Sequence, residues 1–406
     1  MDRRSFLCSI DRDAGVLVFS NALRSFATAV LAVTFPIYLS MIGVPTVLIG
    51  ITFTGRSLFS AVQSLVEGVL ADRIGRKPIL LFIALMIVLG GAVFMLTTDP
   101  TVLVASTVLF SVGGAITYTP AELALLTEKV DSNSRTRVLS LNATFATVGS
   151  ILGNFAAALP AALQALGLPT ITAYQQIFLV LAGAGMLSFF LFLTIKESTP
   201  TSARESMDDV PDQEMDERRL LMKWSGVVAL DQIGGSFNNL LSYWYYLRFG
   251  VGPAEIGLVT GIGRFIATVS FTLGYKMAKR LGTIRATVMS RVPIVLINYI
   301  TPLMPSFTIV AATRMFMSVF SDIDIPLRQS YIMGVTRRNV RATAYGTIQV
   351  VSRFTSAGAP AITGYLYEFV SLSTPFFGAA SFQLASAASM YILFKDIKPP
   401  EEKKTQ

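Results

Sequence analysis

Charged side chains stand inside stretches of this sequence that are otherwise apolar. Two are the carboxylates Asp231 and Asp322, and five are arginines: Arg24, Arg56, Arg264, Arg314 and Arg353. A guanidinium group in an apolar environment attracts anions, and a carboxylate there can take up a proton. Because the chain has no histidine, proton chemistry near neutral pH must fall to carboxylates. The pattern predicts a site that binds an anion and exchanges a proton.

The apolar stretches themselves are too long and too numerous for a water-soluble fold. Hydrophobic residues make up 52% of the 406 residues and charged residues only 14%, so lipid is the predicted solvent. We predict an all-α integral membrane protein with twelve transmembrane helices, near residues 15–41, 47–70, 78–97, 101–126, 138–163, 174–195, 224–247, 254–276, 284–301, 306–333, 342–369 and 374–394.

The position of each charged residue along its apolar stretch indicates how deep it lies in the membrane. At 1.5 Å of rise per residue, the five arginines lie roughly 12–17 Å from the start of their helices, near the middle of the bilayer core. Asp231 lies at roughly 10 Å on the same scale. Arg291 and Arg328 are closer to the helix ends, and we expect them to extend to the membrane surface. Glu122 is also near a helix end, where a structural ion pair is expected.

Two polar segments divide the chain. Residues 196–223 are acidic and polar, which predicts a flexible cytoplasmic linker between an N-terminal six-helix bundle (1–195) and a C-terminal one (224–394). Residues 395–406 form a charged tail. Most of the 33 lysines and arginines fall at the termini, in the linker and in alternate loops, whereas the opposite loops carry only Arg248. Both termini are therefore predicted to be cytoplasmic.

The two halves repeat in sequence. A shift of 207 residues places Ile49-Gly50 on Ile256-Gly257 and Arg73-Ile-Gly75 on Arg280-Leu-Gly282. The same shift places Arg24 on Asp231, so we predict that these opposite charges face each other and form an ion pair, for which a substrate or a proton competes. The alternative is that each is satisfied locally, Asp231 by Gln232 or Ser236 and Arg24 by Asn21 or a carbonyl group.

A charged turn joins the second and third apolar stretches and reads Gly68-Val-Leu-Ala-Asp72-Arg73-Ile-Gly75-Arg76-Lys77-Pro78. Gly68 permits close helix approach, Asp72 suits a helix N-terminus or an Arg, and Gly75 gives the backbone freedom of a tight turn. This turn resembles the signature Gly-x-x-x-Asp-Arg-x-Gly-Arg-Arg/Lys of the major facilitator superfamily. In the second half, Lys279 stands where the acid would be.

The resemblance implies two pseudo-symmetric six-helix bundles that work by alternating access, with substrate bound between them. It implies that Asp72 closes the cytoplasmic side by meeting the N-terminus of the eleventh span, here near Arg341. The drug and proton antiporters of that superfamily carry a Gly-Pro signature in the fifth span and an Arg in the fourth. This chain has Gly153-Asn154 in the fifth span and no Arg between Thr101 and Leu126. Multidrug export is therefore not favoured.

The deep charges suggest the substrate class. Five arginines against two acids favour a small anionic or zwitterionic organic solute, moved by a proton gradient through Asp231 or Asp322. Tyr118 and Asn238 add polar groups to the faces of the fourth and seventh spans. The run Tyr243-Trp244-Tyr245-Tyr246 is typical of an aromatic belt at the membrane surface, and a stacking surface for a flat substrate is the alternative.

Other classes fit the sequence less well. With one cysteine, no histidine and no phosphate-binding glycine loop, the chain has no metal site, no cofactor and no enzyme chemistry that we can predict. Basic residues are scattered over short loops, which argues against nucleic-acid binding. We therefore expect a monomeric transporter of the plasma membrane, with lipid and a small molecule as its partners. The alternatives are an efflux pump for apolar drugs and a non-transporting receptor of transporter ancestry.

Overall fold

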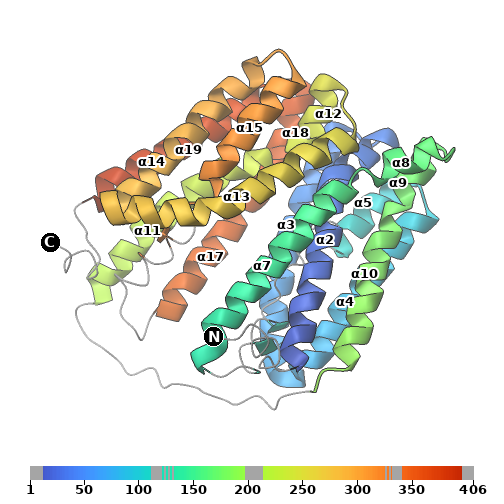
Figure 1. Cartoon of the computed structure of the whole chain (residues 1–406), viewed down its shortest axis with the longest axis horizontal. Coiled ribbons are helices and arrows are strands. Elements are labelled where there is room, and N and C mark those ends of the chain that lie inside the picture. The colour runs from blue at the N-terminus through green and yellow to red at the C-terminus, as the bar shows by residue number, and fades with distance from the viewer. Residues whose placement is uncertain are drawn as a thin grey trace, which may run out of the picture. The chain divides into compact units, whose positions relative to one another are not determined.

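The structure, a computed structural model, describes residues 12–110, 121–122, 125–126, 129, 132–196, 214–324, 327–328, 331 and 341–395. Every element within these ranges is a helix (Figure 1), as a membrane requires, since a helix satisfies its backbone hydrogen bonds internally. The chain forms two compact units. Unit 1 comprises 1–45, 55–204 and 251–261, and unit 2 comprises 46–54, 205–250 and 262–406.

Unit 1 is built around α2 (Arg12–Met41), which packs against α7 (Ser132–Ala156) and α10 (Ile177–Leu193). Helix α10 also packs along α4 (Arg76–Leu96) (Figure 1). Rings fill the space where α2, α4 and α10 meet: Phe94 lies 5.2 Å from Phe35 and 4.7 Å from Phe178, measured between ring centroids. The shorter helices of this unit are α5 (Pro100–Leu109), α8 (Leu159–Ala165) and α9 (Thr170–Gln175).

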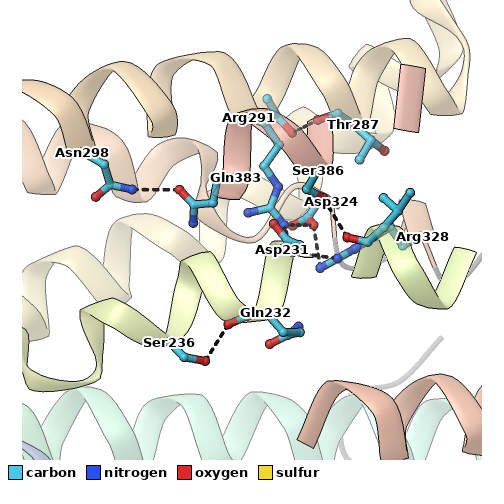
Figure 2. Close-up of polar contacts among 12 residues, drawn as sticks. Asp231, Gln232, Ser236, Thr287, Arg291, Asn298, Asp324, Arg328, Gln383 and Ser386 are labelled. Carbon is cyan, nitrogen blue, oxygen red and sulfur yellow. Dashed lines mark hydrogen bonds and ion pairs between the residues drawn. The ribbon is translucent and has the colours of Figure 1, made fainter. Parts of the chain in front are cut away.

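Unit 2 is built around α11 (Glu214–Ser236), α14 (Thr283–Ile300) and α19 (Thr374–Phe394), with α19 packed against both of the others (Figure 1). The indole of Trp224 stacks on Tyr331 at 4.9 Å and meets Phe394 edge-on at 5.0 Å. A buried amide pair also ties α14 to α19, because Asn298 donates to Gln383 at 2.8 Å (Figure 2). Helix α17 (Arg341–Ala357) packs on α11, and α15 (Phe307–Ser321) packs on α14.

Breaks interrupt two predicted spans of unit 2. The seventh span changes from α11 to the 3-10 segment η1 (Phe237–Leu240) and then to α12 (Leu241–Phe249). The eleventh is broken at Gly358, between α17 and α18 (Ala359–Phe369). A second 3-10 segment, η2 (Thr301–Leu303), follows α14. Because 3-10 geometry is less stable than α-helical geometry, such points deform more readily than the helices beside them.

Two long helices are shared between the units. The first residues of α3 (Thr46–Ile74), through Thr54, belong to unit 2, while the rest belongs to unit 1. The reverse holds for α13 (Pro253–Leu281), whose first residues belong to unit 1. The predicted 207-residue repeat aligns the starts of these two helices. The sequence repeat therefore corresponds to a repeat in packing.

Six helical segments in the described ranges are long and apolar enough to cross a membrane: Arg12–Met41, Arg76–Leu96, Val138–Ala165, Thr170–Leu193, Thr283–Leu303 and Thr374–Phe394. The all-helical prediction is confirmed for the described residues, and the count of twelve spans stays a prediction. Helix α11 carries charges along its first turns, and α15 has only 15 residues. Charged side chains and helix breaks therefore weaken the spanning signal of the remaining helices.

Candidate functional site

Four buried charges form one network in unit 2. Asp231 of α11 accepts hydrogen bonds from Arg291 of α14 at 2.7 Å and from Arg328 at 2.9 Å (Figure 2). Asp324 pairs with the same two arginines, and its distance to Arg328 is 2.7 Å. The two carboxylate side chains are 7% and 2% exposed. Two acids and two guanidinium groups leave the network without net charge, which lowers the cost of burying it.

A second buried pair lies in unit 1. Arg24 of α2 bonds the carboxylate of Glu122 and also donates to Ser20 at 3.3 Å. Its guanidinium carbon lies 5.5 Å from the ring centre of Phe192. Beside it, Asn21 donates to Asn142 at 2.9 Å, which joins α2 to α7. The expected structural ion pair of Glu122 is confirmed, and its partner is Arg24.

These pairings correct two expectations. An ion pair between Arg24 and Asp231 was expected because the 207-residue repeat places these opposite charges at equivalent positions. Each finds one inside its own unit, Arg24 in Glu122 and Asp231 in two arginines, so that expectation is wrong. Arg291 and Arg328 were expected to extend to the membrane surface, but their side chains are only 13% and 18% exposed because they bind buried carboxylates.

Arg314 of α15 is a buried cation of a different kind. The residue is 5% exposed. One terminal nitrogen donates to the Asn238 side chain at 3.2 Å and the other contacts the sulfur of Met317 at 3.6 Å. The guanidinium carbon lies 5.3 Å from the ring centre of Phe376. Among its contacts in the described part of the chain there is no carboxylate, in contrast to Arg24, Arg291 and Arg328.

The aromatic run beside Arg314 packs inside unit 2. Tyr243, Trp244 and Tyr245 are each 1% exposed, and Trp244 meets Phe376 edge-on at 4.6 Å. Tyr245 and Tyr367 are also buried in the neighbourhood of Arg314. Belt residues would present their rings to the lipid surface, so the aromatic-belt interpretation is wrong for these three residues.

The other predicted arginines occupy less buried positions. Arg264 of α13 lies 3.6 Å from Asp322, at the C-terminal end of α15, and their side chains are 57% and 20% exposed. Arg56 of α3 is half-buried, and Arg353 of α17 is exposed. Arg264 and Asp322 therefore form a looser ion pair than the network around Asp231. Tyr118 lies outside the described residues.

The charged turn between α3 and α4 has the geometry expected of its glycine. Gly75 has φ 96°, and its repeat counterpart Gly282 has φ 81°, a region that favours glycine. Lys77 donates to the carbonyl oxygens of Leu193 and Ile195, both at 2.8 Å, and so caps the C-terminal end of α10. Arg73 is exposed and Arg76 half-buried. Gly68, Asp72 and Arg341 lie in helices, but their side-chain positions fall outside the described part.

Sequence reasoning missed members of the buried networks. Asp324 and Arg328 are four residues apart, a spacing that predicts an ion pair on a helix. The partners of Arg291 and Glu122 could not be identified by such a spacing, because they are far away in sequence. Depth counted from a helix start placed both near a membrane surface and so concealed their burial.

Comparisons with known proteins agree with this architecture. A model of the major facilitator superfamily matches residues 17–230 and 224–406. An uncharacterized membrane protein of Saccharomyces cerevisiae, YJR124C, is 20% identical over 405 residues, covering 89% of each chain. Among solved structures, the nucleoside transporter NupG has a TM-score of 0.74 at 11% identity, covering 95% of this chain and 100% of its own.

A D-xylose–proton symporter has a TM-score of 0.74 at 13% identity and covers 95% of this chain and 97% of its own. At such low identity these structures support the fold alone. The family match extends over both halves of the sequence, and the apolar helices agree with a protein that crosses the membrane several times. The chain belongs to the major facilitator superfamily and is a multi-pass membrane transporter, not an enzyme.

Proposed function

We propose that this protein is a secondary active transporter that moves a small organic anion or zwitterion by alternating access, driven by protons. The observation that carries the proposal is Arg314, a buried cation with no carboxylate among its contacts in the described residues. Burying an uncompensated charge costs several kcal/mol. An anionic substrate would supply the missing counter-charge, so that binding relieves a cost that the empty protein bears.

Asp322 is the better candidate for the proton carrier. Protonating Asp231 would weaken its bonds to two buried guanidinium groups, Arg291 and Arg328. The contact between Asp322 and the partly exposed Arg264 is longer than the contacts of Asp231. Asp324 and Arg291 also lie near Asp322. A proton can therefore reach and leave Asp322 at lower cost. It lies eight residues after Arg314, roughly 12 Å along the same helical direction.

The wider architecture supports this mechanism. We place twelve spans in the plasma membrane as two six-helix halves (1–195 and 224–394), with a cytoplasmic linker, cytoplasmic termini and a monomeric assembly. The excess of Lys and Arg in alternate loops supports this orientation. We assign the cytoplasmic gate to the charged turn. The carboxylate of Asp72 would interact favourably with the positive N-terminal end of α17, which begins at Arg341.

The test is flux in proteoliposomes with an imposed pH gradient of either sign. A panel of small organic anions is added, and lumenal pH and solute uptake are measured together. We expect one or more anions to accumulate with proton movement, and Arg314→Gln to abolish this uptake. If neutral apolar compounds were moved instead, and Arg314→Gln transported them normally, the efflux-pump alternative would replace the proposal. Absence of any flux would favour the receptor alternative.

A further inference from the structure

We propose that Arg314 binds the carboxylate of a monoanionic aromatic acid, whose ring packs against the aromatic side chains around the guanidinium group. This inference rests on the proposed function and narrows its substrate class. It depends on three features of the described residues: unsatisfied N–H donors, the apolar character of their surroundings, and the charge that the site can balance.

Two buried N–H donors in this region have no hydrogen-bond partner among the residues that the structure describes. They are Nε of Arg314 and Nε1 of Trp244. Both side chains contact the ring of Phe376, the guanidinium carbon at 5.3 Å and the indole ring at 4.6 Å between centres. Buried N–H groups are nearly always hydrogen-bonded, so two unsatisfied donors beside one ring indicate a place for an acceptor group. A carboxylate supplies such acceptor oxygens and also a negative charge opposite to that of Arg314.

The surroundings of Arg314 suit an aromatic body. Tyr245 and Tyr367 are buried near the guanidinium group, Phe376 lies beneath it, and Met317 contacts it through sulfur. Asn238 is the one amide that bonds it in the described part of the chain. Rings stack well on such side chains. A sugar would bring several hydroxyl groups, and those without partners would lose their bonds to water.

The charge of the site narrows the class of ligand further. The network of Asp231 is balanced internally, whereas Arg314 contributes one positive charge that no carboxylate of the described residues contacts. A monoanion neutralises that charge, whereas a phosphate dianion would leave one negative charge buried. An amino acid would add an ammonium group that needs a carboxylate, and Arg314 has none among its contacts in the described residues. The site therefore favours a monocarboxylate without a second charge.

A change in the 3-10 segment η1 would open the site around Arg314. Arg314 is 5% exposed, so a ligand reaches it only after a rearrangement. Asn238, which holds one guanidinium nitrogen, lies in the 3-10 segment η1 between α11 and α12. Rewinding of this segment would move the amide away from Arg314 and free its donors for a carboxylate. The weakest point of the seventh span therefore lies beside the proposed binding group.

The experiment uses the intrinsic fluorescence of the full-length protein in detergent. The chain has two tryptophans, and Trp224 packs in a separate cluster with Tyr331 and Phe394. The variant Trp224→Phe leaves Trp244 as the single reporter beside Arg314. It is titrated at pH 7.5 with benzoate, benzyl alcohol, lactate and xylose. Circular dichroism and size-exclusion chromatography establish that each variant is folded.

We expect benzoate to change Trp244 fluorescence saturably and the other three compounds to bind at least tenfold more weakly. Arg314→Gln should weaken benzoate binding on the order of ten- to a hundredfold, and Arg314→Lys less. The matched control is Arg285→Gln, which removes an exposed arginine of the same unit and should leave binding unchanged. Competition by benzoate against anion uptake in wild-type proteoliposomes gives a second measurement that needs no substitution.

The outcomes separate this inference from the proposed function. If anions are transported through Arg314 but lactate competes as well as benzoate, the aromatic class is wrong and anion transport stands. Equal binding of benzyl alcohol and benzoate would overturn the role of the carboxylate. If wild-type protein neither moves nor binds any anion of the panel, both proposals fail.

Discussion

Gly50 and Gly257 occupy equivalent positions of the sequence repeat, and each lets the start of its helix approach the backbone of another. A Cβ atom at Gly50 would collide with the carbonyl oxygen of Pro360 in α18, within unit 2. A Cβ atom at Gly257 would collide with the carbonyl oxygen of Asn154 in α7, within unit 1. Both approaches are too close for any residue that has a side chain.

This relationship predicts that Gly50→Ala and Gly257→Ala are each destabilising. Because the nearest atom in each case is a backbone carbonyl oxygen, the helices themselves must separate, at a cost of about 1–3 kcal/mol. Thermal unfolding in detergent measures the effect. Gly183→Ala and Gly226→Ala are matched controls, since their positions are helical with open space around them. Those two should be neutral or stabilising by up to about 1 kcal/mol.

Removing one partner of the Arg24–Glu122 pair should cost more than removing both. Glu122→Gln leaves the guanidinium group of Arg24, 2% exposed, without its counter-charge, a loss of about 3–5 kcal/mol. The double variant Arg24→Gln/Glu122→Gln should recover part of that stability. A double-mutant cycle on unfolding free energy gives the coupling. Strict additivity of the two single effects would show that the pair contributes no coupling energy.

Lys77 should stabilise the end of α10 as well as serve the charged turn. Lys77→Met removes two hydrogen bonds to the carbonyl oxygens of Leu193 and Ile195. It also removes a positive charge that is favourable at the negative C-terminal end of the helix. We expect a loss of about 1 kcal/mol and faster amide hydrogen exchange in residues 191–196. Arg73→Gln changes an exposed cation in the same turn and is the control. Unchanged exchange after Lys77→Met would contradict the capping role.

The elements that could be predicted from sequence are those governed by local physics. Long apolar stretches predicted α2, α4, α10 and α19, because lipid demands continuous helices. Gly75 was predicted to sit in a tight turn because few other residues adopt positive φ. The signature around Asp72 led to the correct superfamily, because it combines six defined positions at fixed spacing.

The charge partners could not be predicted in the same way. Arg24 is 98 positions from Glu122, and Asp231 is 60 from Arg291 and 97 from Arg328. Pairings over such separations depend on how helices pack, and the repeat register suggested a different solution. The burial of Tyr243, Trp244 and Tyr245 was missed for a related reason, since it depends on how α12 packs after the 3-10 segment η1.

The last prediction concerns the two acids proposed at first for proton coupling. Asp322→Asn should abolish the dependence of uptake on the pH gradient, because an amide cannot exchange a proton, while downhill anion exchange persists. Asp231→Asn should act on stability instead, since Arg291 and Arg328 would then share Asp324 alone. A loss of about 3 kcal/mol or more is expected for that variant. Uptake under an imposed gradient and thermal unfolding separate the two roles.

The matched control for Asp322→Asn is Arg264→Gln, which removes its facing guanidinium group and leaves the carboxyl group able to exchange a proton. This variant should keep gradient-driven uptake but shift its pH dependence, because the carboxylate would lose the nearest cation that favours its charged form. If Asp322→Asn retained full gradient dependence while a folded Asp231→Asn lost it, the proton would have to pass through the four-charge network. The balanced charges of Asp231, Asp324, Arg291 and Arg328 would then be the coupling device, and Asp322 an accessory acid.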